Sequence, residues 1–280
     1  MASKQDGNSF KSTNWLKAAL AVALTALSAA GYVQFQAWNL ERLMTFYAVR
    51  RNFPDPASQH FIALVIQGDI DDVLAEAKTV PGGVNAAGTD GLTPLMVAVL
   101  RLNLPMVKAL LAAGANPNGD VKQVPLRTAV RAKNLIIAKT LLEAGANPNG
   151  LPGSEPPLSK AALIGYFEAV DLLLQAGAWV DAPGPLGETA AMTAAAAHNM
   201  DMVNYLLDHG ASLWASGQLG ETVPNFGVTI CLEANNGDPE CDRLIARVKA
   251  AHYPWPPPNV HEIKKLMDEG QWPPKEAKGH

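Results

Sequence analysis

The residues of this chain that most readily carry out chemistry are six histidines and two cysteines, and they are widely scattered. No histidine stands at a metal-ligand spacing from a second histidine, a cysteine or an acid. His261 and Glu262 begin like the helix of a zinc protease, but the second histidine of that motif is missing. The chain has no phosphate-binding glycine loop and no nucleophilic serine turn. We therefore expect no enzyme, no metal, no cofactor and no small-molecule substrate.

The charged residues point the same way. An acidic run at Asp69, Asp71, Asp72 and Glu76 is interpreted as a solvated face, because its loop spacing does not support cation coordination. The formal net charge is −4, and no basic stripe is present to engage phosphates. A nucleic-acid partner is therefore not expected.

The elements that must position these residues come from an internal repeat. Gly-Ala-Asn-Pro-Asn-Gly occurs at Gly114–Gly119 and at Gly145–Gly150, with looser copies at Gly177–Asp181 and Gly210–Trp214. A second landmark lies 20 residues before each glycine. These landmarks are Pro94, Pro125, Pro157 and, with the proline lost, Ala190. A fixed period in the low thirties predicts a solenoid, in which each unit buries its apolar side against its neighbours.

One unit can be interpreted residue by residue. Thr93 is expected to cap a short first helix with Pro94 in its first turn, ending near Asn103. A second helix follows, with one apolar stripe formed by Met106, Val107, Leu110 and Leu111. Gly114 is expected to end it in a left-handed conformation.

The segment Asp90–Ala98, Asp-Gly-Leu-Thr-Pro-Leu-Met-Val-Ala, resembles the ankyrin repeat, with Met96 at the usual histidine. The resemblance implies an all-α solenoid of helix-turn-helix repeats with β-turn or hairpin tips. It places four clear repeats at 89–215 within a repeat domain at 57–252, flanked by degenerate capping repeats. A Pro/Trp-rich tail with a short helix is expected at 253–280.

The resemblance also implies a protein partner in a concave groove. The family's variable contact positions lie six and seven residues after the proline landmark and at the tips. Carried over, these are Leu100, Arg101, Lys122, Gln123, Arg131, Ala132, Leu163, Ile164, Ala196 and Ala197. One half of the groove is then basic and the other is apolar and small. We expect an acidic part of the partner at the basic half; the alternative is that the tail itself fills the apolar stretch.

Cys231 and Cys241 fall on the two expected helices of the last degenerate repeat, around 226–234 and 239–251. Antiparallel helices bring such a pair within bridging distance, so we predict a disulfide, which fits an oxidising compartment. The alternative is two buried thiols that behave as small apolar residues.

The N-terminus predicts a membrane tether. No charged residue occurs from Ala18 to Leu40, a helical length of about 34 Å against a bilayer core of about 30 Å. We expect a cytoplasmic arm at 1–14, a transmembrane signal-anchor helix at 15–40 and a linker helix at 41–56. The alternatives are a cleaved signal peptide, which leaves a secreted or periplasmic protein, and a non-membrane amphipathic helix.

Together these features resemble bacterial ankyrin proteins of the N-terminally membrane-anchored type. The resulting hypothesis is a non-enzymatic inner-membrane scaffold whose repeats bind a periplasmic or envelope protein. The alternative is an immunity or inhibitor protein that blocks an exported toxin or hydrolase, such as a secreted lipase. A repeat domain facing the cytoplasm also remains open, because the positive charges on the two sides of the span nearly balance.

Overall fold

The computed structural model describes residues 51–53, 55–234, 237–274 and 277. The chain divides into a unit ending at Asn52 and a unit from Phe53 to His280, and the second unit is described below. The expected arm at 1–14, the transmembrane helix at 15–40 and most of the linker helix at 41–56 lie outside the described residues. Within the described part of the chain, no helix combines the length and apolar character needed to cross a membrane.

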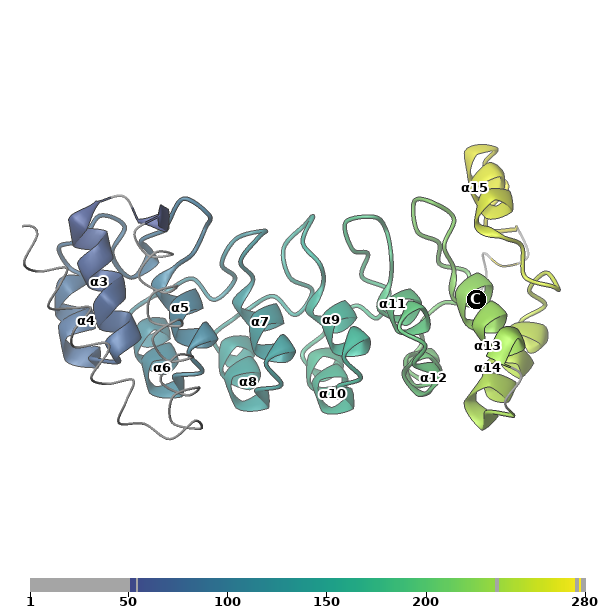
Figure 1. Cartoon of the computed structure of the whole chain (residues 1–280), viewed down its shortest axis with the longest axis horizontal. Helices are drawn as coiled ribbons and strands as arrows, with labels where there is room; N and C mark the ends of the chain where they lie inside the picture. Colours follow the sequence, from purple (N-terminus) through teal and green to yellow (C-terminus); the bar gives the residue numbers. More distant parts are fainter. Residues whose placement is uncertain (1–50, 54, 235–236, 275–276, 278–280) are drawn as a thin grey trace, which may run out of the picture. The chain divides into compact units, whose positions relative to one another are not determined.

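The second unit is a series of helix pairs stacked side by side (Figure 1). The first helices are α3 (Pro56–Gln67), α5 (Pro94–Leu100), α7 (Pro125–Arg131), α9 (Pro157–Leu163) and α11 (Ala190–Ala196). The second helices are α4 (Ile70–Glu76), α6 (Leu104–Ala112), α8 (Leu135–Glu143), α10 (Phe167–Gln175) and α12 (Met200–Asp208). Each first helix packs against the next first helix. The helical solenoid is thus confirmed, and α3 and α4 form a helix pair where the first degenerate cap is expected.

Loops project from one edge of the stack and join each second helix to the next first helix (Figure 1). We call the outermost residues of these loops the tips: 88–92, 120–123, 151–155, 184–188 and 217–221. The tips are closed by turns such as Gly184 N–H to Glu188 C=O at 2.8 Å. Between 55 and 274, in the positions that the structure describes, the tips form turns without strands.

Short polar side chains begin the helices. The Thr93 hydroxyl accepts a hydrogen bond from the Met96 N–H at 3.2 Å, as expected of a capping residue. α5 ends at Leu100, however, and Asn103 caps the next helix by accepting from the Met106 N–H at 3.1 Å. The first helix therefore ends near Asn103, as expected, but Asn103 itself begins the second helix. The left-handed residue of that turn is Leu102, with φ 53°.

The last asparagine of the repeated motif links neighbouring repeats. The Asn118 side chain accepts from the Asn147 N–H at 2.7 Å, and the Asn149 side chain accepts from the Trp179 N–H at the same distance. Asp181 continues this ladder, accepting from the Ser212 N–H at 3.2 and 3.1 Å. Each bond satisfies a backbone donor that the motif's own turn leaves open.

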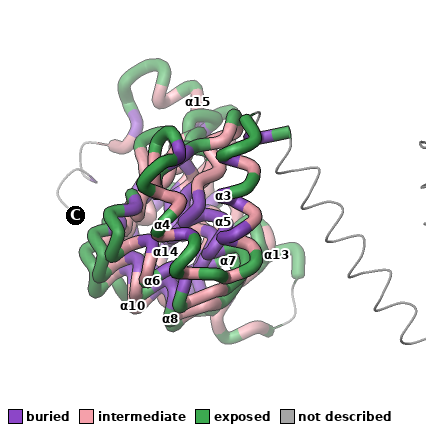
Figure 2. The backbone as a smooth tube through the Cα atoms, turned by 90° about the vertical axis from the view of Figure 1, so that its left-hand side faces the viewer, coloured by how far each residue is buried: buried purple, intermediate pink, exposed green. Residues whose placement is uncertain are grey.

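The core lies between the two rows of helices, where buried positions gather along the middle of the stack (Figure 2). Met106, Val107 and Leu110 of the predicted stripe are fully buried, whereas Leu111 is half-buried. Gly114 has φ 91°, so the glycine predicted to end α6 has the left-handed conformation.

The second degenerate cap departs from the repeat at its first helix. A π-helical segment, η2 (Pro224–Val228), leads into α13 (Thr229–Ala234), and α14 (Pro239–Ala250) follows. Gly227 lets α14 approach closely, because a Cβ atom there would lie 2.6 Å from Leu244 Cδ2. The two expected helices are present, and the extra residue of the π-helix shifts the register of the first.

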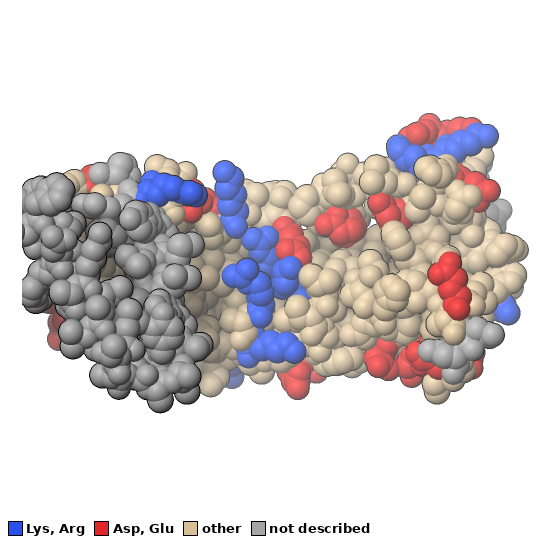
Figure 3. All heavy atoms as spheres, in the orientation of Figure 1, with Lys and Arg blue, Asp and Glu red and all other residues tan. Residues whose placement is uncertain are grey.

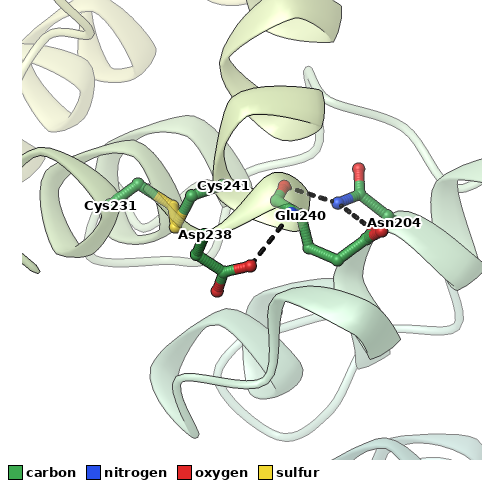
Figure 4. The surroundings of a disulfide bond; sticks show 5 residues. All are labelled: Asn204, Cys231, Asp238, Glu240 and Cys241. Atoms are coloured by element: carbon green, nitrogen blue, oxygen red, sulfur yellow. Dashed lines mark hydrogen bonds between the residues drawn. A yellow bond between two sulfur atoms is a disulfide. The ribbon is translucent and has the colours of Figure 1, made fainter. Parts of the chain in front are cut away.

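A disulfide joins Cys231 of α13 to Cys241 of α14, with Cα atoms 5.3 Å apart, and both residues are buried (Figure 4). The predicted pairing is present in the structure. Beside it, the Asn204 amide of α12 donates to the Glu240 carbonyl at 2.8 Å and to its carboxylate at 3.0 Å. These bonds attach the cap to the last clear repeat.

The tail adds α15 (Val260–Asp268), which Asn259 and Glu262 begin with a capping box. α15 lies against the last tip, where a Cβ on Gly220 would meet the Val260 carbonyl oxygen at 2.2 Å.

Beyond α15, Trp272 of the expected Pro/Trp-rich tail is buried, with 8% of its surface exposed. The Trp272 ring lies 5.7 Å from Trp214 and 5.6 Å from Tyr253. These contacts are at the end of the stack, and Leu163 remains 43% exposed. Trp272 therefore does not cover the apolar stretch, in contrast to the alternative expected for the tail.

Candidate partner-binding face

The predicted contact residues lie at the exposed ends of successive first helices. Each helix contributes its last residue and the residue that caps it: Leu100 and Arg101 on α5, Arg131 and Ala132 on α7, Leu163 and Ile164 on α9, Ala196 and Ala197 on α11. All are exposed except Ile164, which is half-buried. Because consecutive first helices pack together, these pairs form one row.

The other two predicted residues, Lys122 and Gln123, lie in the tip that precedes α7. Asp120 fixes that tip, since one oxygen of its carboxylate accepts from the Lys122 N–H at 2.9 Å and from the Gln123 N–H at 2.7 Å. The Lys122 side chain is exposed and Gln123 is half-buried. The row of helix ends and the adjoining tips are called the first-helix face below.

Two later tips are held in the same way. The Glu188 carboxylate accepts from the Leu186 N–H at 2.8 Å, and the Glu221 carboxylate accepts from the Leu219 N–H at 3.1 Å. The Gln218 N–H also donates to the Leu186 carbonyl at 2.7 Å, which ties one tip to the next. Leu186 and Leu219 are left 55% and 60% exposed on these braced turns.

Sequence reasoning missed part of the basic half. Arg127 and Lys160 both approach Glu155, at 3.8 Å and 3.0 Å, and the Arg127 guanidinium donates to the Lys122 carbonyl at 3.0 Å. The signal was a basic residue inside each first helix, Arg127 at the third position of α7 and Lys160 at the fourth position of α9. Figure 3 shows lysine and arginine side chains gathered around α7.

The other half of the face, called the neutral half, has no basic side chain, and the Glu188 and Glu221 carboxylates of its tips accept from backbone N–H groups. No lysine or arginine occurs between Lys160 and Arg243. In the view of Figure 3, a broad surface without charge lies beside the basic cluster, toward α11. Exposed Leu163, Leu186 and the Ala196–Ala197 pair belong to this half. The residues of this face are thus basic at one end and apolar at the other, and their contact with a partner stays a prediction.

Two carboxylates on the second helices, Asp171 and Asp208, have structural partners. The Tyr205 hydroxyl of α12 donates to the Asp171 carboxylate of α10, and that bond raises the pKa of Tyr205 to about 12. Asp208 pairs with Arg247 and Arg243, and the hydrogen bond from Arg247 chiefly lowers the pKa of that carboxyl. Within the described ranges, no three His, Cys, Asp or Glu side chains gather in a way that would hold a metal.

Comparison with known proteins gives one family. Residues 59–151 and 152–223 match a model of ankyrin repeats, described as three copies, and these ranges cover more than half of the chain. Comparison with curated proteins gives no match. Ankyrin repeats indicate a module for protein–protein interaction. The helix pairs, their stacking and the matched ranges agree, and the chain belongs to the ankyrin-repeat family.

Proposed function

We propose that the protein is a membrane-tethered scaffold that binds a partner protein of the cell envelope through its first-helix face. The observation that carries this proposal is the row of exposed helix ends, Leu100 to Ala197, beside braced tips. Such a surface is pre-organised, so a partner does not have to order loops when it binds.

The proposed location rests on two independent features. The charge-free segment from Ala18 to Leu40 is long enough to span a bilayer as a helix. The Cys231–Cys241 disulfide is typical of proteins in oxidising compartments. Both favour a helix at 15–40 in the inner membrane and repeats in the periplasm. Activity of a C-terminal alkaline phosphatase fusion tests this topology, and an inactive but stably produced fusion would contradict it.

Affinity capture of the full chain from solubilised membranes tests the binding face. We expect the wild type to retain a partner that an Arg101→Glu/Arg131→Glu variant loses. A Lys78→Glu/Lys108→Glu variant is the control, because it changes charge equally at exposed residues away from that face. Equal capture by all three proteins would exclude the assigned face. A captured hydrolase that loses activity when bound would favour the inhibitor alternative over the scaffold.

A further inference from the structure

The two halves of the first-helix face differ in chemistry, and this difference describes the partner. We propose that the face binds a protein segment with clustered Asp or Glu residues at one end and aliphatic residues at the other. The acidic end meets Lys122 and Arg131, and the aliphatic end covers α9 and α11. This inference rests on the proposed function, since it names the chemistry of the segment that the same face takes.

Uncompensated positive charge lies at two residues of the basic half. Lys122 and Arg131 are exposed, and within the described residues neither side chain forms an ion pair. Arg127 and Lys160, by contrast, share the Glu155 carboxylate. Asp120, the acid in the same tip as Lys122, already accepts from two backbone N–H groups of that tip. An acidic cluster in the partner supplies the missing counter-charge and speeds association.

The neutral half favours aliphatic side chains. Leu163 and Leu186 are 43% and 55% exposed, and the residues beside them on α11 are alanines. The Glu188 carboxylate accepts a hydrogen bond from the Leu186 N–H of the same tip. An acidic partner residue over this half would lose hydration without gaining a counter-ion, because no lysine or arginine occurs between Lys160 and Arg243, and that loss is costly. Aliphatic residues gain free energy from the apolar area that they bury there.

The stacking of the repeats sets the spacing within the segment. Arg131 and Leu163 occupy the same position in adjacent repeats, and packed helices lie about 8–10 Å apart. The acidic and aliphatic clusters are therefore separated by about three residues in an extended segment. In a helical segment, which rises about 1.5 Å per residue, the separation is about six residues.

Selection from a random library of 16-residue peptides, displayed on phage, against the purified full chain tests this chemistry. We expect the wild type to enrich peptides with separate acidic and aliphatic clusters at one of these two spacings. A Lys122→Glu/Arg131→Glu variant should bind those peptides about tenfold more weakly, as expected for two reversed exposed charges. A Leu163→Asp variant should weaken the same peptides through their aliphatic cluster. The Lys78→Glu/Lys108→Glu control should bind them as the wild type does.

The outcomes of this selection distinguish a failure of the proposed partner chemistry from a failure of the proposed binding function. If enriched peptides lack the acidic cluster, but an Ala197→Arg substitution abolishes their binding, the face binds peptides and the proposed chemistry is wrong. If the acidic cluster is enriched equally by the Lys122→Glu/Arg131→Glu variant, the chemistry is also wrong. If no peptide is enriched, or none responds to substitutions on the face, the inference and the proposed function both fail.

Discussion

Asp181 is the one carboxylate in a ladder that asparagines otherwise supply, and replacing it with asparagine should stabilise the protein. Its side chain accepts from the Ser212 N–H, just as Asn149 one repeat earlier and Asn118 two repeats earlier accept from a backbone N–H of the following repeat. Burial raises the pKa of the Asp181 carboxyl, and the Ser212 N–H offsets only part of that effect. An amide oxygen keeps the hydrogen bond and removes the cost of burying a charge.

The sign of the expected change in stability follows from the direction in which folding shifts the pKa of Asp181. A carboxyl whose pKa is raised on folding contributes its stabilisation below about pH 4, the ordinary range of an aspartate. That contribution is lost as the pH rises through the raised pKa of Asp181, so the folded protein carries a penalty at neutral pH. Asp181→Asn should therefore match the wild type at low pH and exceed its stability at pH 7.

The expected increase in the free energy of unfolding of Asp181→Asn at pH 7 is modest. Solvent reaches part of the Asp181 side chain, so we expect about 0.5 kcal/mol, the lower end of the range for a buried polar group. For a domain of this size that corresponds to about 1–2 °C in the unfolding midpoint. Asp181→Ala should be about 1 kcal/mol less stable than Asp181→Asn, because the Ser212 N–H then loses its acceptor.

Thermal unfolding of the full chain, followed by circular dichroism between pH 3 and pH 8, measures these differences. Lower stability of Asp181→Asn than of the wild type at pH 7 would refute the reasoning. A stability gap that does not change with pH would refute it equally, because the penalty would then have no electrostatic origin.

Three further predictions concern the ends and the back of the stack. Replacing Cys231 and Cys241 with serine should cost about 3 kcal/mol, because the disulfide restricts the unfolded chain by joining residues that are 10 positions apart, and dithiothreitol should lower the unfolding midpoint of the wild type only. Trp272→Ala should cost about 3 kcal/mol and speed hydrogen exchange in α15, whereas unchanged exchange would show that the tail docks without this ring. Asp171→Asn should bring the pKa of Tyr205 from about 12 toward its ordinary value of 10.0 in an ultraviolet titration, since the carboxylate that disfavours ionisation is gone. A pKa that stays near 12 in that variant would contradict this cause.

The sequence predicts the repeats well because their signals are local. Thr93 caps a helix through its own third neighbour, and Gly114 needs only a backbone conformation. The disulfide also follows, once both cysteines are placed on paired helices. In each case one segment of the chain contains the physical cause.

The contacts that the sequence did not predict join residues that are far apart along the chain. The sequence around Asn118 indicates a turn, yet the Asn118 side chain accepts a hydrogen bond from the Asn147 N–H of the next repeat. Trp272 lies two residues after Gly270 and directly before two prolines, which indicates a loop, but its partners Trp214 and Tyr253 lie at the end of the stack. Such contacts form only when the repeats are stacked.

The basic half of the first-helix face shows the same limit. Lys122 and Arg131 were found from their positions in the repeat. The pairing of Arg127 and Lys160 with Glu155 was not found, because it joins two helices and a tip. The positions of charged residues in the sequence predicted the polarity of the face. The structure is needed to distinguish Arg127 and Lys160, which pair with Glu155, from Lys122 and Arg131.

The central claim, that a partner protein binds the first-helix face, is tested most directly by photo-crosslinking in living cells. A photoreactive amino acid is placed at Ala132 or Ala197 on the face, and at Ala144 or Ala176, the exposed alanines that end α8 and α10 on the other row. We predict that the two face positions form the same adduct of defined mass and that the two second-helix positions do not. An adduct formed equally from all four positions, or only from Ala144 and Ala176, would contradict the account.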